Sequence, residues 1–300
     1  MRAPFNGVRT DGEIIIPLLC VHKEGMPFSE GLAYPYEYTV RMFYVKDQLS
    51  AIEKWISYLE DLFHVKVSAL DLFFDNFEKE EDINRIMDYY CSESSEHKLE
   101  EFHLDNGGYT KDSALYNERP VSILKRQNAS ETLTIAFDPS PSFNFDFELL
   151  KAYPNRLHVY DSRWIRWEQV LDMKSSSVFL LKSNFLSSQI ESLVQKWKSG
   201  WTPGWETLQI DLCETFDVFR CVPEGSMDIE FGDYPNVASL LRHDSVQSFK
   251  FQHIDETTTK STDGFHLVRS DKMVITVTRE HSGHCFFQIL PEDPEYEFLI

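Results

Sequence analysis

The sequence predicts an α/β fold in which strands and helices alternate in an irregular array with a mostly parallel, curved sheet. Three observations support this class. Apolar strands alternate with amphipathic helices over residues 47–215, and the strand centres recur every 20 to 33 residues or so, as in solenoid repeats. Residues 216–300 instead contain strands joined by short turns. We therefore predict N-terminal strands (1–46), a βα repeat-like region (47–215) and a C-terminal antiparallel β-meander with a tail (216–300).

Two strands and a helix are predicted at the start. The runs "EIIIPLLCV" and "YEYTVRMFYV" are rich in β-branched and aromatic residues, which favour strands. The next segment, "DQLSAIEKWISYLEDLF", has the spacing of an amphipathic helix. Its expected apolar face comprises Leu49, Ile52, Ile56, Leu59 and Phe63.

Strands and helices continue to alternate after this helix. "KVSALDLFFDN" and "KLEEFHLDN" are predicted strands on either side of the helix "EEDINRIMDYY". In the second strand, Leu99, Phe102 and Leu104 are expected to face the core. Both strands end in patterns similar to the L-x-L-x-x-N signature of leucine-rich repeats, so the array is expected to be leucine-rich-repeat-like.

Three more strands are predicted in the middle of the chain: "ETLTIAFD" (131–138), "RLHVYDS" (156–162) and "SVFLLKS" (177–183). The segment "RWIRWEQVLDM" between the last two is a predicted helix. Trp164, Trp167 and Leu171 share one face of it.

A further helix is predicted at the start of "SSQIESLVQKWKSGWTPGWETLQIDL" (187–212). Ser188 and Glu191 have the spacing of a capping box, and Gly200 is suited to end the helix. The apolar stripe consists of Ile190, Leu193, Val194 and Trp197.

The same segment ends in a predicted strand. Leu208, Ile210 and Leu212 alternate with Gln209 and Asp211, which indicates one buried and one exposed face. Because a helix separates this strand from "SVFLLKS", we expect the two strands to be parallel.

The last part of the chain predicts antiparallel hairpins. "GFHLVRS", "MVITVTRE" and "HCFFQILP" are short strands separated by turn-like residues. We expect them to form the meander that caps the βα array, whose end would otherwise expose core.

Composition narrows the function. The net charge of −20 disfavours binding to nucleic acid or membranes, because both attract Lys- and Arg-rich surfaces. The five cysteines are irregularly spaced and suggest neither a disulfide framework nor a zinc finger. No apolar run of membrane-spanning length and no secretory signal are apparent. We therefore expect an intracellular protein, cytoplasmic or nuclear, with a protein partner.

Acidic residues concentrate between Asp71 and Asp105, where 12 acidic and 3 basic side chains give a net charge of −9. Such a run is typical of a solvated face, and an acidic docking patch is the alternative. Both interpretations place these side chains at the surface.

Three segments carry a family resemblance. The first, residues 156–212, contains a tryptophan motif (Trp164, Ile165), a helix start (Ser187), a W-x-x-G helix end (Trp197, Gly200) and a closing strand (Leu208, Ile210). The second is "TDGFHLVRSDKMVITV", with Gly264, Arg269 and Asp271, and the third is "YLEDLFHVKVSALDL". Together they resemble the nematode F-box-associated domain, type 2.

This resemblance implies a protein that selects targets for a cullin-based ubiquitin ligase and catalyses nothing itself. Full-length members bind a Skp-type adaptor through an F-box. The first 46 residues show no F-box pattern, so adaptor binding is implied only if a divergent or missing F-box exists. The family's usual asparagine-proline-arginine loop is replaced by "WTPGWE".

We predict that Trp201, Trp205, Gln209 and Asp211 bind the partner. The two tryptophans flank Pro203 and Gly204 in a loop, and tryptophan is enriched in binding hot spots. Gln209 and Asp211 are expected on the exposed face of their strand. No catalytic, cofactor-binding or metal-binding residues are predicted: catalytic and phosphate-binding signatures are absent, and "HSGHC" (281–285) has no second ligand pair.

The sequence thus predicts a protein-protein interaction module resembling the substrate-recognition part of an F-box subunit, with no cofactor. One alternative is a stand-alone binding module with no ligase link. Another, from a different class, is a hydrolase that uses a Ser/His pair.

Overall fold

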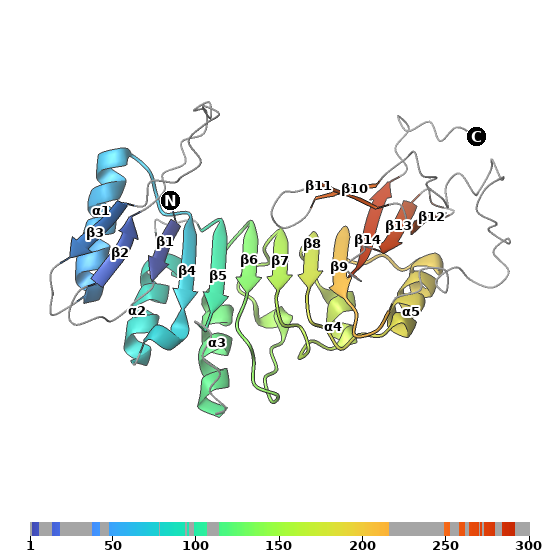
Figure 1. Ribbon diagram of the computed structural model, residues 1–300, viewed down its shortest axis with the longest axis horizontal. Coiled ribbons are helices and arrows are strands. Elements are labelled where there is room, and N and C mark those ends of the chain that lie inside the picture. Colours follow the sequence, from blue (N-terminus) through green and yellow to red (C-terminus); the bar gives the residue numbers. More distant parts are fainter. Residues whose placement is uncertain are drawn as a thin grey trace. The chain divides into compact units, whose positions relative to one another are not determined.

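The computed structural model describes residues 2–5, 14–18, 38–42, 48–77, 79–93, 95, 99–106, 114–215, 249–252, 258–261, 264–269, 271, 273–279 and 284–291. The chain divides into two compact units, 1–158 and 159–300. Strands and helices alternate, and many of the strand pairs are parallel (Figure 1). The predicted α/β class is confirmed.

Four parallel strands form the sheet of the first unit. Their order is β1-β4-β5-β6, and they are β1 (Arg2–Phe5), β4 (Ala69–Phe73), β5 (Glu101–Asp105) and β6 (Thr132–Ile135). The two strands predicted near the N-terminus, β2 (Ile14–Leu18) and β3 (Tyr38–Met42), form a separate antiparallel pair.

Three helices belong to the first unit: α1 (Gln48–Phe63), α2 (Glu80–Cys91) and α3 (Ala114–Arg126). Two 3-10 turns, η1 (Phe74–Asn76) and η2 (Phe147–Leu149), follow β4 and precede β7. Side-chain bonds fasten α2 on both sides. Arg85 donates to the Glu53 carboxylate on α1 at 2.9 and 2.6 Å, and Arg126 on α3 donates to Asn84 Oδ1 and Asp88 Oδ1, each at 2.6 Å.

The core of the first unit lies between one face of the sheet and the helices. Alternate strand residues are almost completely buried, namely Leu70, Leu72, Phe102, Leu104, Leu133 and Ile135. The buried side of α2 consists of Ile83, Ile86, Met87 and Tyr90. Burial of each large apolar side chain stabilises the fold by about 1.5–3 kcal/mol. The predicted inward orientation of Leu99, Phe102 and Leu104 is confirmed.

The second unit combines parallel and antiparallel pairs. β7 (Arg156–Val159) spans the division between the units. β8 (Ser177–Leu180) pairs in parallel with β9 (Thr207–Asp211), as predicted. β9 then pairs antiparallel with β14 (His284–Pro291), β14 with β13 (Met273–Arg279), and β13 with β12 (Gly264–Val268). A separate hairpin joins β10 (Phe249–Gln252) and β11 (Thr258–Ser261).

The helices of the second unit are α4 (Trp167–Asp172) and α5 (Ser187–Lys198). α4 begins at Trp167, so the prediction that Trp164 lies on this helix is wrong. Residues 163–164 form a turn instead, which the hydrogen bond from the Ile165 N–H to Ser162 O closes at 3.0 Å.

Helix α5 carries its predicted apolar stripe but not its predicted cap. Ile190, Leu193, Val194 and Trp197 are all at most 1% exposed. The helix begins one residue before Ser188, and the Leu186 N–H donates to Gln189 Oε1 at 2.8 Å, so the Ser188–Glu191 capping box is wrong. Gly200 follows the helix with φ +104°, as expected for a helix-ending glycine.

None of the helices in the described residues is long and apolar enough to cross a membrane.

Candidate functional site

A half-exposed polar face lies on the other side of strands β4 to β6. The residues between the buried ones are half-buried or exposed, and we call them the polar sheet face: Asp71, Phe73, Glu101, His103, Asp105, Thr132 and Thr134. The strand period of two explains this alternation, because successive side chains point to opposite sides of the sheet.

Such a face is uncommon on parallel strands. Parallel sheets are usually covered on both faces and therefore read as continuous apolar runs. Here β4, β5 and β6 each alternate instead, with the patterns "ALDLF", "EFHLD" and "TLTI". Selection of polar side chains on one face fits a sheet that meets water or another polar surface there.

The strand register brings the polar side chains into rows. Asp71 pairs with His103, and His103 pairs with Thr134. His103 Nδ1 lies 3.8 Å from Asp71 Oδ1, and His103 Nε2 lies 3.9 Å from Asp105 Oδ2. Both distances exceed hydrogen-bonding range. The Phe73 ring also lies against the imidazole, with 6.1 Å between ring centroids.

The polar sheet face carries carboxylate, imidazole and hydroxyl groups. Among the described residues no group of three His, Cys, Asp or Glu side chains could hold a metal ion. Within the described residues, His103 Nε2 is buried and has no hydrogen-bond partner. Three carboxylates, from Asp71, Glu101 and Asp105, give the face a negative character that favours Lys or Arg in a ligand.

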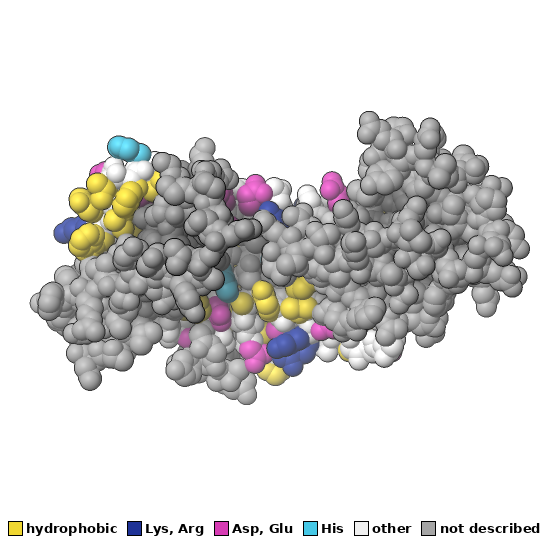
Figure 2. All heavy atoms as spheres, turned by 45° about the horizontal axis from the view of Figure 1, so that its top comes forward, with side chains coloured by type: hydrophobic (Ala, Val, Ile, Leu, Met, Phe, Trp, Pro, Cys, Tyr) yellow, Lys and Arg dark blue, Asp and Glu magenta, His cyan; other side chains and the backbone are white. Residues whose placement is uncertain are grey.

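A second surface feature is the apolar face of α1, formed by Trp55, Tyr58, Leu62 and Phe63. Their exposed fractions are 46%, 55%, 53% and 50%. Hydrophobic side chains gather over α1 in Figure 2. The prediction that Phe63 lies on the buried face is therefore wrong, whereas Ile56 is buried as expected. The buried side of the helix also includes Glu60, which accepts the Val67 N–H at 2.9 Å.

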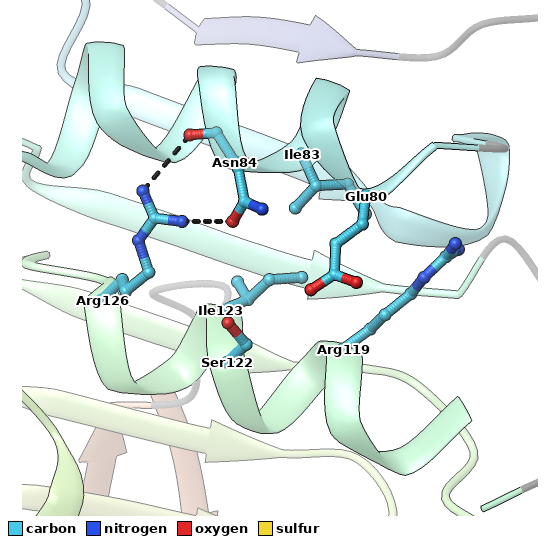
Figure 3. A pocket seen from close by; sticks show the side chains of 7 residues that line it. All are labelled: Glu80, Ile83, Asn84, Arg119, Ser122, Ile123 and Arg126. Carbon is cyan, nitrogen blue, oxygen red and sulfur yellow. Dashed lines mark hydrogen bonds between the residues drawn. The ribbon is translucent and has the colours of Figure 1, made fainter. Parts of the chain in front are cut away.

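A hollow between α2 and α3 is too small for an organic ligand. Glu80, Ile83, Asn84, Arg119, Ser122, Ile123 and Arg126 line it (Figure 3). Its free volume is about 10 Å³, roughly enough for one water molecule. Arg126 donates a hydrogen bond to Asn84, and Arg119 donates one to Phe77 O at 3.0 Å. Both guanidinium groups therefore connect α3 to other segments of the first unit.

Trp205 does not present its ring to solvent, contrary to our prediction. It is 2% exposed, and its Nε1 donates to Val170 O at 3.0 Å. The loop lies close to the end of α4: a Cβ on Gly204 would come within 2.8 Å of Met173 O. The indole is part of the core of the second unit.

Gln209 is also buried, at 6% exposure, so the predicted exposed face of β9 is wrong there. Its neighbours in register are Phe179 on β8 and Phe286 on β14, both buried. β9 has a partner strand on each side, and both of its faces are covered at this position.

Asp211 and Trp201 are half-buried and serve the local structure. Asp211 Oδ2 accepts the Lys182 N–H at 3.1 Å, and Asp211 O accepts the Ser183 hydroxyl at 2.6 Å. These bonds hold Lys182 at φ +46°, a conformation that is uncommon outside glycine. Trp201 lies under the Lys196 ammonium, 5.0 Å from the ring centroid. The structure does not gather the four predicted residues into one exposed site.

The residues behind the family resemblance meet at Arg269. Its guanidinium donates to Trp197 O and Trp201 O, each at 3.0 Å, and to Thr202 Oγ1 at 2.9 Å. It also lies over the Trp197 ring, 4.9 Å from the centroid. Asp271 accepts from Arg269 Nη2 at 2.7 Å, and this hydrogen bond lowers the pKa of Asp271. We call this arrangement the Arg269 clamp; it ties Trp197 O in the last turn of α5, which also accepts the Gly200 N–H, and Trp201 O in the following loop to one side chain.

Buried titratable groups elsewhere are poor candidates for chemistry. Burial raises the pKa of Cys91 to about 12, which keeps it a thiol, and it also raises the pKa of Tyr90. Burial, with a smaller effect of Arg156, lowers the pKa of His158 to about 4. His158 is therefore neutral at pH 7.

No family model, curated protein or solved structure matches the chain.

Proposed function

We propose that this chain is a protein-protein interaction module, similar to the substrate-recognition part of F-box subunits, and that it catalyses nothing itself. The observation that carries the proposal is the polar sheet face. A half-exposed row of Asp, His, Thr and Phe side chains on parallel strands has no structural need to be polar, and it suits the docking of a protein segment.

The chemistry of this face favours a basic target. Asp71, Glu101 and Asp105 attract Lys and Arg side chains, and Phe73 offers an apolar contact beside them. The acidic stretch 71–105 is then a docking patch rather than only a solvated surface.

The proposal also includes the kind of α/β fold. We infer a leucine-rich-repeat-like array with a curved sheet, in which strands present the binding surface and helices lie behind. The alternation of β4 to β6 supports the array. The antiparallel pairing of β14 with β9 supports a C-terminal meander that caps the array.

A paired set of variants tests the binding face. Thr132→Arg with Thr134→Arg adds two bulky cations to the polar sheet face, at positions that are half-buried. Ser192→Arg with Gln195→Arg adds the same charge at exposed positions of α5 and is the matched control. Proteins captured by the wild-type chain from cell extract are quantified by mass spectrometry for all three chains.

The proposal predicts that the face variant loses the captured target at least about tenfold, as hot-spot substitutions do, and that the control keeps it. Equal capture by all three chains would overturn the assignment of the face. Circular dichroism spectra and thermal midpoints verify that both variants fold.

Co-elution with a Skp-type adaptor on size exclusion tests the ligase link separately, with a known F-box as positive control. A stable complex would support a receptor with a divergent F-box. Separate elution would favour the stand-alone binding module, which leaves the polar sheet face as its docking site.

A further inference from the structure

We propose that the apolar face of α1 binds the same face of a second copy of this chain, with the two helices antiparallel. This inference is independent of the proposed function, because it concerns a different surface and a different partner.

The face has the geometry of a helix-packing stripe. Trp55, Tyr58 and Leu62 are spaced i, i+3 and i+7, so they align along one side of the helix. Trp55 and Tyr58 pack edge to face, with ring centroids 5.7 Å apart and an interplanar angle of 86°. Large apolar side chains that gather on an exposed surface commonly mark an interaction site.

Charges beside the stripe indicate which partner fits. Lys54 and Asp61 are both exposed, and seven residues separate them, so they border the stripe on the same side. Lys54 lies near the start of the stripe and Asp61 near its end. A twofold axis across the stripe reverses the second helix and keeps its charged border on the same side.

Each Lys54 then meets the Asp61 of the second copy, and the pair occurs twice. A parallel twofold arrangement would instead place the two charged borders on opposite sides of the interface, where Lys54 and Asp61 of the two copies do not meet. The face is thus complementary to itself in the antiparallel orientation, as a twofold interface requires.

The exposed area sets the strength of the association. Each large apolar side chain contributes about 100 Å² of exposed surface, half of what such residues bury when fully covered. Two copies would bury roughly 600 Å² from Trp55, Tyr58 and Leu62, which is below the range of stable complexes. We therefore expect a weak dimer that dissociates on dilution.

Sedimentation velocity of the full chain over about a hundredfold range of concentration tests the inference. The expected result is a monomer-dimer equilibrium that Trp55→Ala removes. Leu149→Ala is the matched control, because Leu149 is 48% exposed but lies away from α1. A monomer at every concentration would overturn the proposal, as would a dimer that Trp55→Ala leaves intact.

A charge swap tests the orientation and does not depend on the aromatic side chains. Lys54→Asp and Asp61→Lys, made singly, each place like charges opposite one another twice, and we expect each to weaken the dimer at least about fivefold. The double variant restores opposite charges and should recover dimerisation to within about twofold. Failure of the double variant to recover would contradict the antiparallel arrangement. Circular dichroism spectra of W55A and of both single swaps verify that the variants are folded, so that a loss of dimer is due to the changed interface.

Discussion

The Arg269 clamp joins several parts of the second unit through one side chain. The Arg269 side chain is 8% exposed, and its guanidinium donates to two backbone carbonyls, a hydroxyl and a carboxylate. Arg269→Ala leaves those carbonyls without their charged donor, and we expect it to reduce the free energy of unfolding by about 2–3 kcal/mol. Arg269→Lys keeps the charge but loses the planar fork, so its loss should be smaller but measurable. Urea denaturation of both variants gives the values; an unchanged midpoint for Arg269→Ala would contradict the clamp.

His158 predicts how stability depends on pH. Its pKa is lowered to about 4 by burial, whereas an unfolded histidine titrates near 6.5. The unfolded chain therefore binds the proton first as the pH falls, so the stabilisation is complete above pH 6.5 or so and is lost toward pH 4. The loss amounts to roughly 3 kcal/mol.

His158→Gln removes this titration and should flatten the dependence over the same interval. Urea unfolding at several pH values compares the two chains. Parallel pH profiles for the wild-type chain and the variant would show that His158 does not cause the loss.

At the scale of elements, two glycines around the loop after α5 make separate predictions. Gly200 has φ +104° and open space around it, so Gly200→Ala should cost about 1 kcal/mol from backbone strain alone. Gly204 is close to Met173 O, and Gly204→Ala should cost more, about 1–3 kcal/mol, because backbone must move. Thermal unfolding ranks the two; a smaller effect at Gly204 would mean that the loop gives way easily.

The sequence identified most elements because their periodicity is local. The inward residues of "KLEEFHLDN" and the stripe of α5 follow directly from local apolar spacing, and both predictions were confirmed. Helix α3 was not predicted, because Pro120 lies inside it and an internal proline argues against a helix. Strand β1 escaped because it is four residues long and is stabilised by β4, more than 60 residues later.

Burial of Trp205 and Gln209 could not be read from local pattern. A loop tryptophan beside proline and glycine is often exposed, but the close approach of this loop to α4 encloses the indole. Gln209 is a polar residue between apolar ones in the sequence, as expected for the exposed side of a strand. It is buried because Phe179 and Phe286, its neighbours in register, flank it on both sides. The register that places Asp71 beside His103 across β4 and β5 appeared only in the fold, because it depends on the pairing of two strands about 30 residues apart.

At the scale of the whole molecule, we propose different partners for two surfaces. The polar sheet face is assigned to a basic protein target, and the apolar face of α1 to a second copy. Both belong to the first unit, whereas the Arg269 clamp stabilises the second. Substitutions in the clamp should therefore lower stability without changing which protein is bound by correctly folded chain.

Binding at the polar sheet face is the central claim, and hydrogen exchange tests it most directly. The captured target is added to the purified chain, and amide protection is compared with and without it. We expect new protection in β4, β5 and β6, and none of it when Thr132→Arg and Thr134→Arg are present. Protection confined to the loop around Trp201, or to α1, with unchanged exchange in β4 to β6, would contradict it.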